Sequence, residues 1–598
     1  MNPQLRVALR LHRAGDLAAA ERIYLNVLSA DADPIASHYL GLIRLAKSQI
    51  EEGLDLLRQS VARSPTQAEF HLNLGIALRK HYGPQDAIAY LERATTIAGA
   101  PRRAYLHLGE ACVSLGQYHN ALKALDVALT QPTDRAAAAS LMSFALEHLE
   151  RLQQAEEFAA LAHELDPDDY EKRLRVAKLS ARNNRFDNAL NHFDVLISKS
   201  PTTEVMMGRA ACLLACGRFD EVIAITKNAL ANTPEHAEWI SLRGQGLYQA
   251  GFFHDAADCF ESALTKSPST SSLETHAAIA HLLTGNFTRG WELFERRDTW
   301  PQSIVSNQQL HRASPKTLPN GISRWDGAYG SAETVMVRGE QGVGDEIMFG
   351  TLLPEVARRC KKMCIQVDDR LVGLFARAFP DATIIEHGAP LESMQINAAV
   401  KMGSLGGLFR RSREAFRSFN GAYLRADPER VSDFRDRLGT TSEPICGLSW
   451  KTLSPESETS RNIQIEQLCA FINLPGFRYL SLQYGCNHQE LSTLTSGLGS
   501  RLVTLPDIDL MEDLEGVAAL IACCDIVVSV GNSVAHMAGA LGKQTLALIP
   551  FVPGWRWGIE GDHCLWYETV KIFRQDAPGN WSTPLRSVKS ALQRMERS

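Results

Sequence analysis

Small and apolar residues recur at steps of 34 positions along the first half of the chain. The step is clearest in the pairs Leu40-Gly41, Leu74-Gly75 and Leu108-Gly109. Alanines continue it at Ala87, Ala121, Ala155 and Ala189, and prolines punctuate it at Pro34, Pro65, Pro101, Pro132, Pro167, Pro201, Pro234 and Pro268. A step of this length holds two amphipathic helices, and Pro can begin a helix without losing a hydrogen bond.

The small residues predict that the two helices of each step approach closely. A larger apolar residue then fills the seam between neighbours, at Leu57, Leu91, Leu125, Phe193, Phe260 and Phe294. Ser143 and Ala210 stand where glycine is usual, so two steps are degenerate. The pattern resembles the tetratricopeptide repeat, which implies a superhelix over residues 1–298 with a concave face for a peptide or partner helix. A purely structural spacer is the alternative.

The pattern changes after residue 298. Residues 299–331 are rich in Pro and Gly and are predicted to form a linker, with Trp300 and Trp325 as its anchors. Short apolar runs then alternate with helical stretches, which is typical of an α/β fold with parallel sheets. We predict a first domain over 332–430 and a second over 431–598.

Ten short apolar runs are the candidate strands of these two domains. The first domain has runs at 333–337, 363–367, 383–386 and 398–402, and the second at 445–450, 479–483, 502–505, 526–530, 545–549 and 570–573. Helical patterns lie at 465–472, 514–522 and 584–595. Two consecutive α/β domains imply a cleft, and ligands bind at the carboxyl ends of such strands.

Composition and charge narrow the class of protein. The 598 residues are 45% hydrophobic with a formal net charge of −6, which argues against a partner that is a nucleic acid or an anionic membrane. No apolar run is long enough to span a membrane and no signal peptide is evident, so a cytoplasmic protein is expected. The cysteine pairs Cys212/Cys216 and Cys360/Cys364 lack further ligands, so reduced core thiols are favoured over a metal site.

The stretch from Asp525 to Pro550 is the strongest candidate for binding chemistry. An apolar strand leads through Gly531 and Asn532 into a short helix that starts at Ser533, and a second strand follows. The N-terminus of such a helix, with small residues and backbone N–H groups, suits a phosphate group. His536 lies one turn into the helix, near the same anion. Turns of this kind occur in any doubly wound domain, which is the alternative.

Three stretches resemble the heptosyltransferase-type glycosyltransferases of family 9. They are Gly339-Glu-Gln-Gly-Val-Gly-Asp-Glu346; Gly447-Leu-Ser-Trp-Lys451 with Ser460–Ile463 and Ser481–Gly485; and Ser529–Gly542 with Pro550–Trp557. The resemblance covers about residues 330 to 590 and implies a GT-B fold of two Rossmann-like domains. Joined to tetratricopeptide repeats, the chain looks like bacterial transferases that include flagellin glycosyltransferases, in which the repeats recruit the protein acceptor.

The resemblance implies an inverting transfer that needs no metal and no cofactor other than the nucleotide-sugar donor. Asp345 matches the position of the catalytic base, with Glu346 as second choice and a helix cap as the alternative for Asp345. Donor-binding residues are expected in the glycine-rich loop and at the ends of the strands: Gly342, Gly344, Trp450, Lys451, Arg461, Gln483, Asn532, Ser533 and His536. A solvated surface lysine is the alternative for Lys451.

Several side features leave alternatives open. The glycine spacing at 339–344 does not fit a dinucleotide fingerprint. Asp507-Ile508-Asp509 resembles a metal-binding motif but precedes a helix, which favours capping. Trp555, Arg556 and Trp557 either stack on a sugar or base or pack a loop on the core. The family commonly has Asp-Thr where this chain has Gly531-Asn532, so the usual carboxylate at the donor sugar is missing.

These features together predict a protein O-glycosyltransferase. The repeats would hold a protein acceptor, for which the resemblance names flagellin first, and the second half would transfer a sugar to Ser or Thr. The absence of a carboxylate at Gly531 would suit an acidic donor sugar, such as a nonulosonic acid carried by CMP. One alternative is transfer to a lipopolysaccharide or glycan acceptor. The other is a repeat adaptor whose transferase half catalyses nothing, and Gly531 is its best support.

Overall fold

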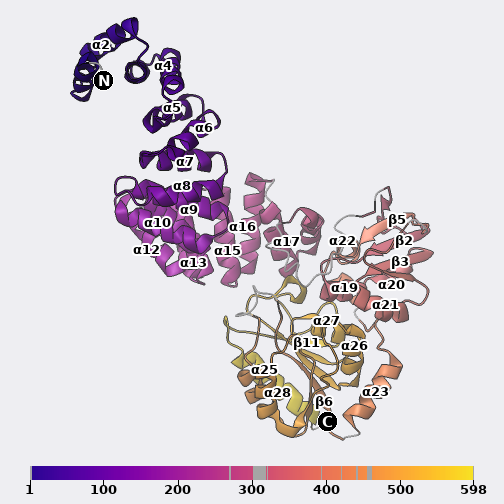
Figure 1. The fold of residues 1–598 in the computed structure, drawn as a ribbon. Coiled ribbons are helices and arrows are strands. Elements are labelled where there is room, and N and C mark those ends of the chain that lie inside the picture. The colour runs from indigo at the N-terminus through magenta and orange to yellow at the C-terminus, as the bar shows by residue number, and fades with distance from the viewer. Residues whose placement is uncertain are drawn as a thin grey trace. The chain divides into compact units, whose positions relative to one another are not determined.

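The computed structural model describes residues 3–268, 271–300, 318–319, 321–391, 394–418, 421–439, 442–453 and 461–596. The chain forms two compact units, Met1–Arg218 and Phe219–Ser598. The prediction of a helical repeat superhelix followed by an α/β region is confirmed (Figure 1).

The first unit consists of helices that follow one another in pairs, each in contact with the next along the chain. The helices are α1 (Pro3–Arg13), α2 (Leu17–Ala30), α3 (Pro34–Ala46), α4 (Ile50–Arg63), α5 (Ala68–His81), α6 (Pro84–Thr96), α7 (Arg103–Ser114), α8 (Tyr118–Ala128), α9 (Arg135–His148), α10 (Leu152–Leu165), α11 (Tyr170–Arg182), α12 (Phe186–Lys199) and α13 (Thr203–Ala215). Pro34 begins α3 as predicted, and Asp33 caps it by accepting hydrogen bonds from two backbone N–H groups.

Glycines allow the close approach of paired helices that the sequence predicts. A Cβ on Gly75 would lie only 2.7 Å from the side chain of Leu91, and one on Gly41 would lie 3.0 Å from that of Leu57. In the degenerate fourth step, Ser143 is buried instead and accepts a hydrogen bond from Arg175 Nε at 2.8 Å. The seam residues are therefore core residues of the superhelix.

The second unit begins with five helices of the same kind. They are α14 (Phe219–Asn232), the pair α15 (Ala237–Gln249) and α16 (Phe253–Lys266), and the pair α17 (Ser271–Leu283) and α18 (Phe287–Phe294), followed by the short 3-10 helix η1 (Arg297–Thr299). The described part of the predicted linker includes Trp325, which is buried and donates its backbone N–H to Ala399 O at 2.9 Å. Residues 301–317 lie outside the described residues.

A parallel sheet in the order β1-β5-β2-β3-β4 follows. Its strands are β1 (Ser323–Arg324), β2 (Thr334–Arg338), β3 (Lys362–Val367), β4 (Thr383–Glu386) and β5 (Ala398–Lys401). Its helices are α19 (Val343–Gly350), α20 (Leu353–Ala357), η2 (Asp369–Leu371), α21 (Val372–Ala378), α22 (Ser404–Phe409) and η3 (Glu414–Ser418). The predicted strands match within one residue, but β1 lies in the predicted linker, because two residues are too short to show a periodic pattern.

A second parallel sheet has the order β11-β10-β9-β6-β7-β8. Its strands are β6 (Ile445–Ser449), β7 (Arg478–Ser481), β8 (Leu502–Val503), β9 (Ile526–Val530), β10 (Thr545–Ile549) and β11 (Val570–Arg574). Its helices are α23 (Pro428–Leu438), α24 (Ile465–Ile472), α25 (His488–Leu498), η5 (Gly499–Arg501), α26 (Leu514–Cys523), α27 (Ser533–Ala540), η6 (Trp555–Trp557) and α28 (Ser582–Glu596).

The strand order defines a crevice at the carboxyl ends of the strands in each sheet. Counted along the chain, the second sheet runs 3-2-1-4-5-6, the doubly wound order in which direction reverses between strands 1 and 4. These strands are β6 and β9, so the crevice lies where Trp450 and Gly531 follow them. In the first sheet the reversal falls between β2 and β5. Ligands of such folds bind beside the carboxyl ends of these strand pairs.

Candidate functional site

One cavity of about 240 Å³ lies at the crevice of the second sheet. It is closed from the other side by the N-terminal turn of α19, and a Cβ on Gly344 would lie 3.6 Å from both Ser533 Cα and His536 Cδ2. Of the predicted site residues, the cavity brings together Gly342, Gly344, Asp345, Arg461, Asn532, Ser533 and His536. Residues from three separate sequence motifs therefore line one space.

Asp345 lies in the first turn of α19 and lines this cavity. Its Oδ1 accepts hydrogen bonds from Arg556 Nε at 2.6 Å and Arg556 Nη2 at 2.5 Å. The helix begins after Gly342, whose extended backbone supplies the carbonyl that accepts from the N–H of Asp345 at 2.9 Å. Among the described residues, no side chain caps this helix start. Asp345 is therefore held by Arg556 and is not the helix cap that was the alternative.

The other acidic residue of this turn, Glu346, faces away from the cavity. It is buried, its Oε2 accepts from the N–H of Asp368 at 2.8 Å, and its Oε1 lies 2.8 Å from His387 Nε2. Burial raises the pKa of Glu346, although His387 counteracts part of the shift. Glu346 joins α19 to the residues that follow β3 and β4 and does not line the cavity.

Asn532 caps α27 and ties it to the neighbouring strand. Its Oδ1 accepts from the N–H groups of Val534 and Ala535 at 3.0 and 3.4 Å, and its Nδ2 donates to Ser449 Oγ at 2.8 Å. The first-turn N–H groups were expected to be open to a phosphate, but the Asn532 side chain takes two of them. An anion at this helix would meet Ser533 and the positive end of the helix dipole.

His536 is buried in the wall of the cavity, one turn into α27. Its ring stacks on Trp557 at 4.8 Å between centroids, and its Nδ1 lies 3.2 Å from the hydroxyl of Tyr567. Burial, helped by the charge of Arg556, lowers the pKa of His536 to about 3. The ring is neutral at physiological pH, so it contributes a hydrogen-bonding group and not a positive charge.

Gln483 and Trp450 lie behind the cavity. The Oε1 of Gln483 accepts from Ser449 Oγ and from the N–H groups of Trp450 and Lys451 at 2.7–3.1 Å, while its Nε2 donates to Lys451 O and Tyr484 O. Trp450 is buried in the core of the second sheet. Both residues fix the loop after β6, and neither is among the described residues that line the cavity.

Lys451 points to a neighbouring depression. Its Nζ forms an ion pair with Glu490 at 2.6 Å, and both line a polar pocket of about 490 Å³ together with Asn462 and Asn487. The carboxyl of Glu490 is partly buried, but its hydrogen bonds to Lys451 and Asn487 hold its pKa below the usual range. The Lys451 side chain thus lines a different pocket from Asp345 and is not a free surface side chain.

Among the described residues, three arginines line the cavity, and two of them were not singled out for this role from the sequence. Arg370 is held by Asp368, with Nε to Oδ1 at 2.7 Å, and donates to Met511 O at 3.0 Å. Arg556 pairs with Asp345, and Arg461 is the predicted cation. No sequence motif signals Arg370, because it comes from η2 and is placed only by packing of the two sheets.

The aromatic residues near the cavity lie either in the core or in the cavity wall. Trp555 is buried in the core, where it contacts Trp291 and Phe294, whereas Trp557 lines the cavity. Tyr484 also lines it, and burial raises the pKa of its hydroxyl despite hydrogen bonds with Ser533 and Thr452. Trp555 therefore packs the Trp-Arg-Trp turn on the core, as one of the two interpretations predicts, whereas stacking of Trp557 on a sugar or base stays a prediction.

Trp557 also explains the glycine at position 531. A Cβ on Gly531 would lie 2.6 Å from Trp557 Nε1 and 3.0 Å from Ile549 Cδ1. An aspartate cannot be accommodated there unless Trp557 moves. The indole ring of Trp557 therefore lies where the side chain of an aspartate at position 531 would begin, and this ring lines the cavity.

Other candidate features have structural roles. Asp509 Oδ1 accepts from the N–H groups of Met511 and Glu512, and Asp507 pairs with Arg437, so this motif caps a turn as expected. Within the described residues, no group of three or more His, Cys, Asp or Glu is arranged to hold a metal ion. In the same part of the chain, none of the helices has the length and hydropathy needed to cross a membrane.

Comparisons with known proteins bear on both halves of the chain. The tetratricopeptide repeat model matches residues 72–140 and 241–303. Protein FlbA of Caulobacter vibrioides is 27% identical over 501 residues, which cover 80% of this chain and 82% of that protein. Because the repeats make up about half of the sequence, this similarity extends into the α/β half.

Solved structures of repeat proteins match smaller parts of the chain. MamA from Desulfovibrio magneticus RS-1 has 21% identity and a TM-score of 0.27, over 28% of this chain and 94% of that chain. YrrB, described as a TPR protein with an unusual peptide-binding site, has 21% identity and a TM-score of 0.27, over 31% of this chain and 91% of that chain.

Proposed function

We propose that the second unit binds a nucleotide-sugar in the cavity between α19 and α27 and transfers the sugar to a Ser or Thr hydroxyl of a protein held by the repeats. The observation that carries the proposal is the convergence of Asp345, Arg461 and the N-terminus of α27 on one cavity. All three lie in motifs that resemble glycosyltransferases, and the cavity lies where a doubly wound sheet binds its ligands.

The residues of the cavity supply the two functions that an inverting transfer needs. Asp345 takes the proton of the attacking hydroxyl, and the anomeric carbon is then attacked as the nucleotide phosphate leaves. Both Arg556 contacts fall on Oδ1, so Oδ2 of Asp345 is the oxygen that faces the acceptor. Arg461, Arg370, Ser533 and the dipole of α27 stabilise the leaving phosphate.

The donor side of the cavity favours a sugar that needs no carboxylate partner. Trp557 occupies the space beside Gly531, and the described cavity walls carry three arginines and one aspartate that pairs with Arg556. An acidic sugar, such as a nonulosonic acid carried by CMP, would meet no opposing free carboxylate among these residues.

The repeats offer a groove for the acceptor protein. A depression of about 610 Å³ lies on helices α7, α9 and α11, the first helices of successive pairs, and its apolar part includes Val113, Leu141 and Phe144. Phe144 is 37% exposed, and Arg175 lies over its ring at 5.4 Å from the centroid. An apolar groove edged by charged side chains suits a peptide segment. A protein such as flagellin is the proposed acceptor.

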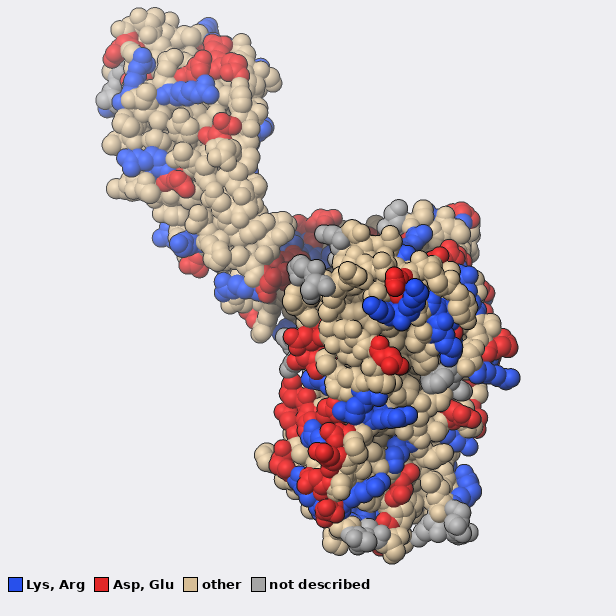
Figure 2. Space-filling view, turned by 90° about the vertical axis from the view of Figure 1, so that its right-hand side faces the viewer, with Lys and Arg blue, Asp and Glu red and all other residues tan. Residues whose placement is uncertain are grey.

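A basic surface would favour transfer to a lipopolysaccharide acceptor. On the face drawn in Figure 2, basic and acidic side chains are interspersed over the α/β unit and do not gather into one basic surface. The competing candidate is a repeat adaptor without activity, because the ion pair with Arg556 engages the carboxylate of Asp345, the proposed base. A transfer assay separates an adaptor from a transferase.

The test is transfer by an Asp345→Asn variant. Wild-type protein is incubated with flagellin and CMP-, UDP-, GDP- or ADP-linked sugars, and the mass of intact flagellin is measured. We expect a mass increase with one donor, and a loss of about 10²- to 10⁴-fold in rate for the variant, because a general base is removed. Binding of the nucleotide should persist.

The matched control is Asp507→Asn. Asp507 is also a carboxylate paired with an arginine, but it is exposed and is not among the described residues of the cavity lining. This variant should transfer sugar at the wild-type rate. Equal activity of the Asp345 variant would show that Asp345 is not the base, and nucleotide binding without transfer in the wild type would favour the adaptor.

A further inference from the structure

The end of the repeat array is built into the core of the first sheet domain. Trp291 of α18 donates its indole N–H to Arg410 O at 2.8 Å. A Cβ on Gly406 of α22 would lie 2.6 Å from the Trp291 ring, so glycine permits this contact. The same ring lies against Phe349 of α19. Helix α18 thus packs on the helix that carries Asp345.

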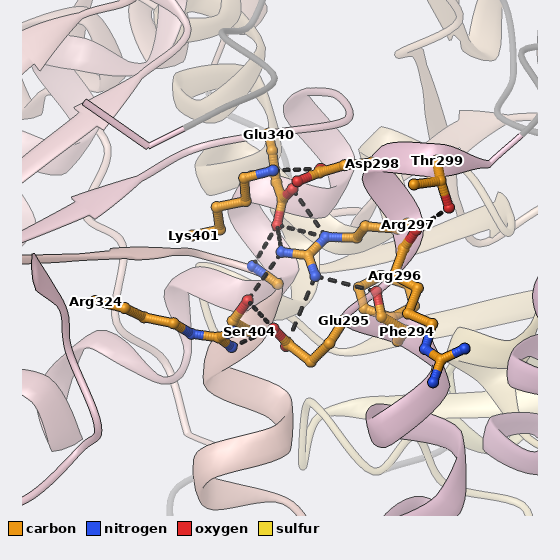
Figure 3. A network of polar contacts seen from close by, with 11 residues as sticks. Phe294, Glu295, Arg296, Arg297, Asp298, Thr299, Arg324, Glu340, Lys401 and Ser404 are labelled. Carbon is orange, nitrogen blue, oxygen red and sulfur yellow. Dashed lines mark hydrogen bonds and ion pairs between the residues drawn. The ribbon is translucent and has the colours of Figure 1, made fainter. Parts of the chain in front are cut away.

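A buried ion pair joins the residues that follow α18 to the glycine-rich loop between β2 and α19, residues 339–344. Figure 3 shows Arg297 reaching Glu340 from η1. Arg297 Nε lies 2.9 Å from Glu340 Oε2 and Nη2 lies 2.5 Å from Oε1, a bidentate arrangement. The two side chains are 4% and 9% exposed. The Nη2 group also donates to Ser404 Oγ at 3.0 Å.

This pair lies at the reversal point of the first sheet. Glu340 follows β2, and its Oε1 accepts from the N–H of Gly403, which follows β5, at 2.9 Å. Such a crevice is the place where a doubly wound sheet usually holds its ligand. In this chain the guanidinium group of Arg297 occupies it.

Glu340 is connected to Asp345 by the hydrogen bonds of the glycine-rich loop. Glu340 O accepts from the N–H of Gly342 at 3.0 Å, and Gly342 O accepts from the N–H of Asp345 at 2.9 Å. Between them Gln341 has a φ of +70°, a left-handed conformation that a residue with a side chain adopts at a cost. A loop with such a conformation needs fixed points at its ends.

A buried ion pair contributes little net stability compared with apolar side chains of the same size. Net stability therefore does not explain this ion pair, whereas its contacts with the glycine-rich loop do. We infer that Arg297 is a positioning residue: by holding Glu340, the last repeat fixes the glycine-rich loop so that Asp345 faces the cavity. The role given to Asp345 rests on the proposed function, whereas the holding of the loop does not.

The neighbouring pair Lys401–Asp298 supplies a matched control. It joins the same η1 helix to the same sheet, but Asp298 is 47% exposed and its partner lies on β5 and not in the loop. An Asp298→Asn variant therefore disturbs the same interface without releasing Glu340. Arg297→Met leaves the buried carboxylate of Glu340 without its partner Arg297. The double variant Arg297→Met/Glu340→Gln removes both charges and is measured alongside it. Arg297→Lys keeps the charge but loses the bidentate geometry.

The experiment is hydrogen exchange of the full-length proteins, read in peptides that cover 339–346 and, as an internal reference, 526–530. We expect exchange in 339–346 to become about tenfold faster in the double variant, because local opening is no longer opposed by Arg297. The reference peptide and the Asp298→Asn protein should not change. Unchanged exchange at 339–346 in the folded double variant, or in Arg297→Lys if the double variant does not fold, would overturn the proposal.

Transfer measured on the same proteins separates this inference from the proposed function. We expect the rate constant for transfer to fall about tenfold or more in the double variant, with nucleotide binding retained, because a displaced Asp345 impairs catalysis and not donor affinity. Faster exchange with wild-type transfer would contradict the positioning role. If the wild type transfers no sugar at all, the proposed function fails, while exchange still decides whether Arg297 holds the loop.

Discussion

At the scale of single residues, the neutral state of His536 has a measurable consequence. Its pKa of about 3 in the folded protein compares with an ordinary value of 6.5. Between these values the unfolded chain binds a proton that the folded chain does not, so stability rises with pH over this window and falls on acidification. The largest slope that one such group contributes is about 1.4 kcal/mol per pH unit.

The prediction is tested by comparing wild type with His536→Gln from pH 7 to pH 4. The difference between their unfolding midpoints should shrink or reverse as the pH falls, because the variant carries no proton-binding ring. Other histidines whose pKa values are lowered by burial or partial burial, such as His38 and His192, contribute the same sign to both proteins and cancel in the comparison. A constant difference across this pH range would show that His536 is not held neutral by burial.

The residues that line the cavity could be predicted from the sequence where a motif determines their place in the fold. They were predicted less well where the packing of distant segments determines it. Asp345, Ser533 and His536 lie in motifs, and all three line the cavity. Gln483 and Trp450 lie in motifs too, but they do not line the cavity. Gln483 holds the loop after β6 by hydrogen bonds, and Trp450 packs in the core of the second sheet. A sequence pattern marks that such residues are near a site. It does not tell which side of a strand end faces the ligand.

Among the elements, the turn between α9 and α10 has an unfavourable backbone conformation. Gly116, Gly217, Gly251 and Gly285 have left-handed φ values at the turns between paired helices, and Glu150 occupies the equivalent turn with a φ of +56°. A left-handed conformation costs a residue with a Cβ about 1–2 kcal/mol. The Glu150 side chain is 79% exposed and its ion pair with Arg182 spans 3.8 Å, so it offsets little of this cost.

Glu150→Gly should therefore stabilise helices α9 and α10 by about 1 kcal/mol, seen as about fivefold slower exchange of their amide hydrogens. The control is Glu157→Gly, at an exposed position inside α10, which should accelerate exchange because glycine weakens a helix interior. Faster exchange in Glu150→Gly would mean that the Glu150 side chain stabilises the turn by more than its conformation costs.

Elements were predicted best where one pattern covers enough residues. The strands at 383–386, 526–530 and 545–549 and the helix at 465–472 match in both bounds, because each is a continuous or periodic apolar run between breakers. Strand β8 was predicted too long and β1 was missed, because these edge strands have only two residues each. Their pairing is decided by the neighbouring strands, which the local sequence does not describe.

Along the full chain, the boundary between the two compact units does not fall at the end of the repeats. The second unit starts at Phe219 and contains the last helix pairs together with both sheets. Trp291 and Arg297 show why: their partners, Arg410 and Glu340, lie more than 40 residues further along the chain. Repeat spacing identifies helix pairs from sequence, but contacts between distant residues decide where a unit begins.

Nucleotide binding in the cavity between α19 and α27 is measured with a thermal-shift panel of CMP, CDP, UDP, GDP and ADP. A ligand that binds only the folded state raises the midpoint temperature of unfolding. At a ligand concentration of a hundred times Kd, the free energy of unfolding increases by about 2.7 kcal/mol. The matched variants are Gly344→Ala, whose Cβ fits at 3.6 Å from Ser533, and Gly344→Leu, whose larger side chain fills the cavity. We predict that one nucleotide raises the midpoint of the wild type and Gly344→Ala but not that of Gly344→Leu. An equal rise in Gly344→Leu, or no rise with any nucleotide, would contradict nucleotide binding in this cavity.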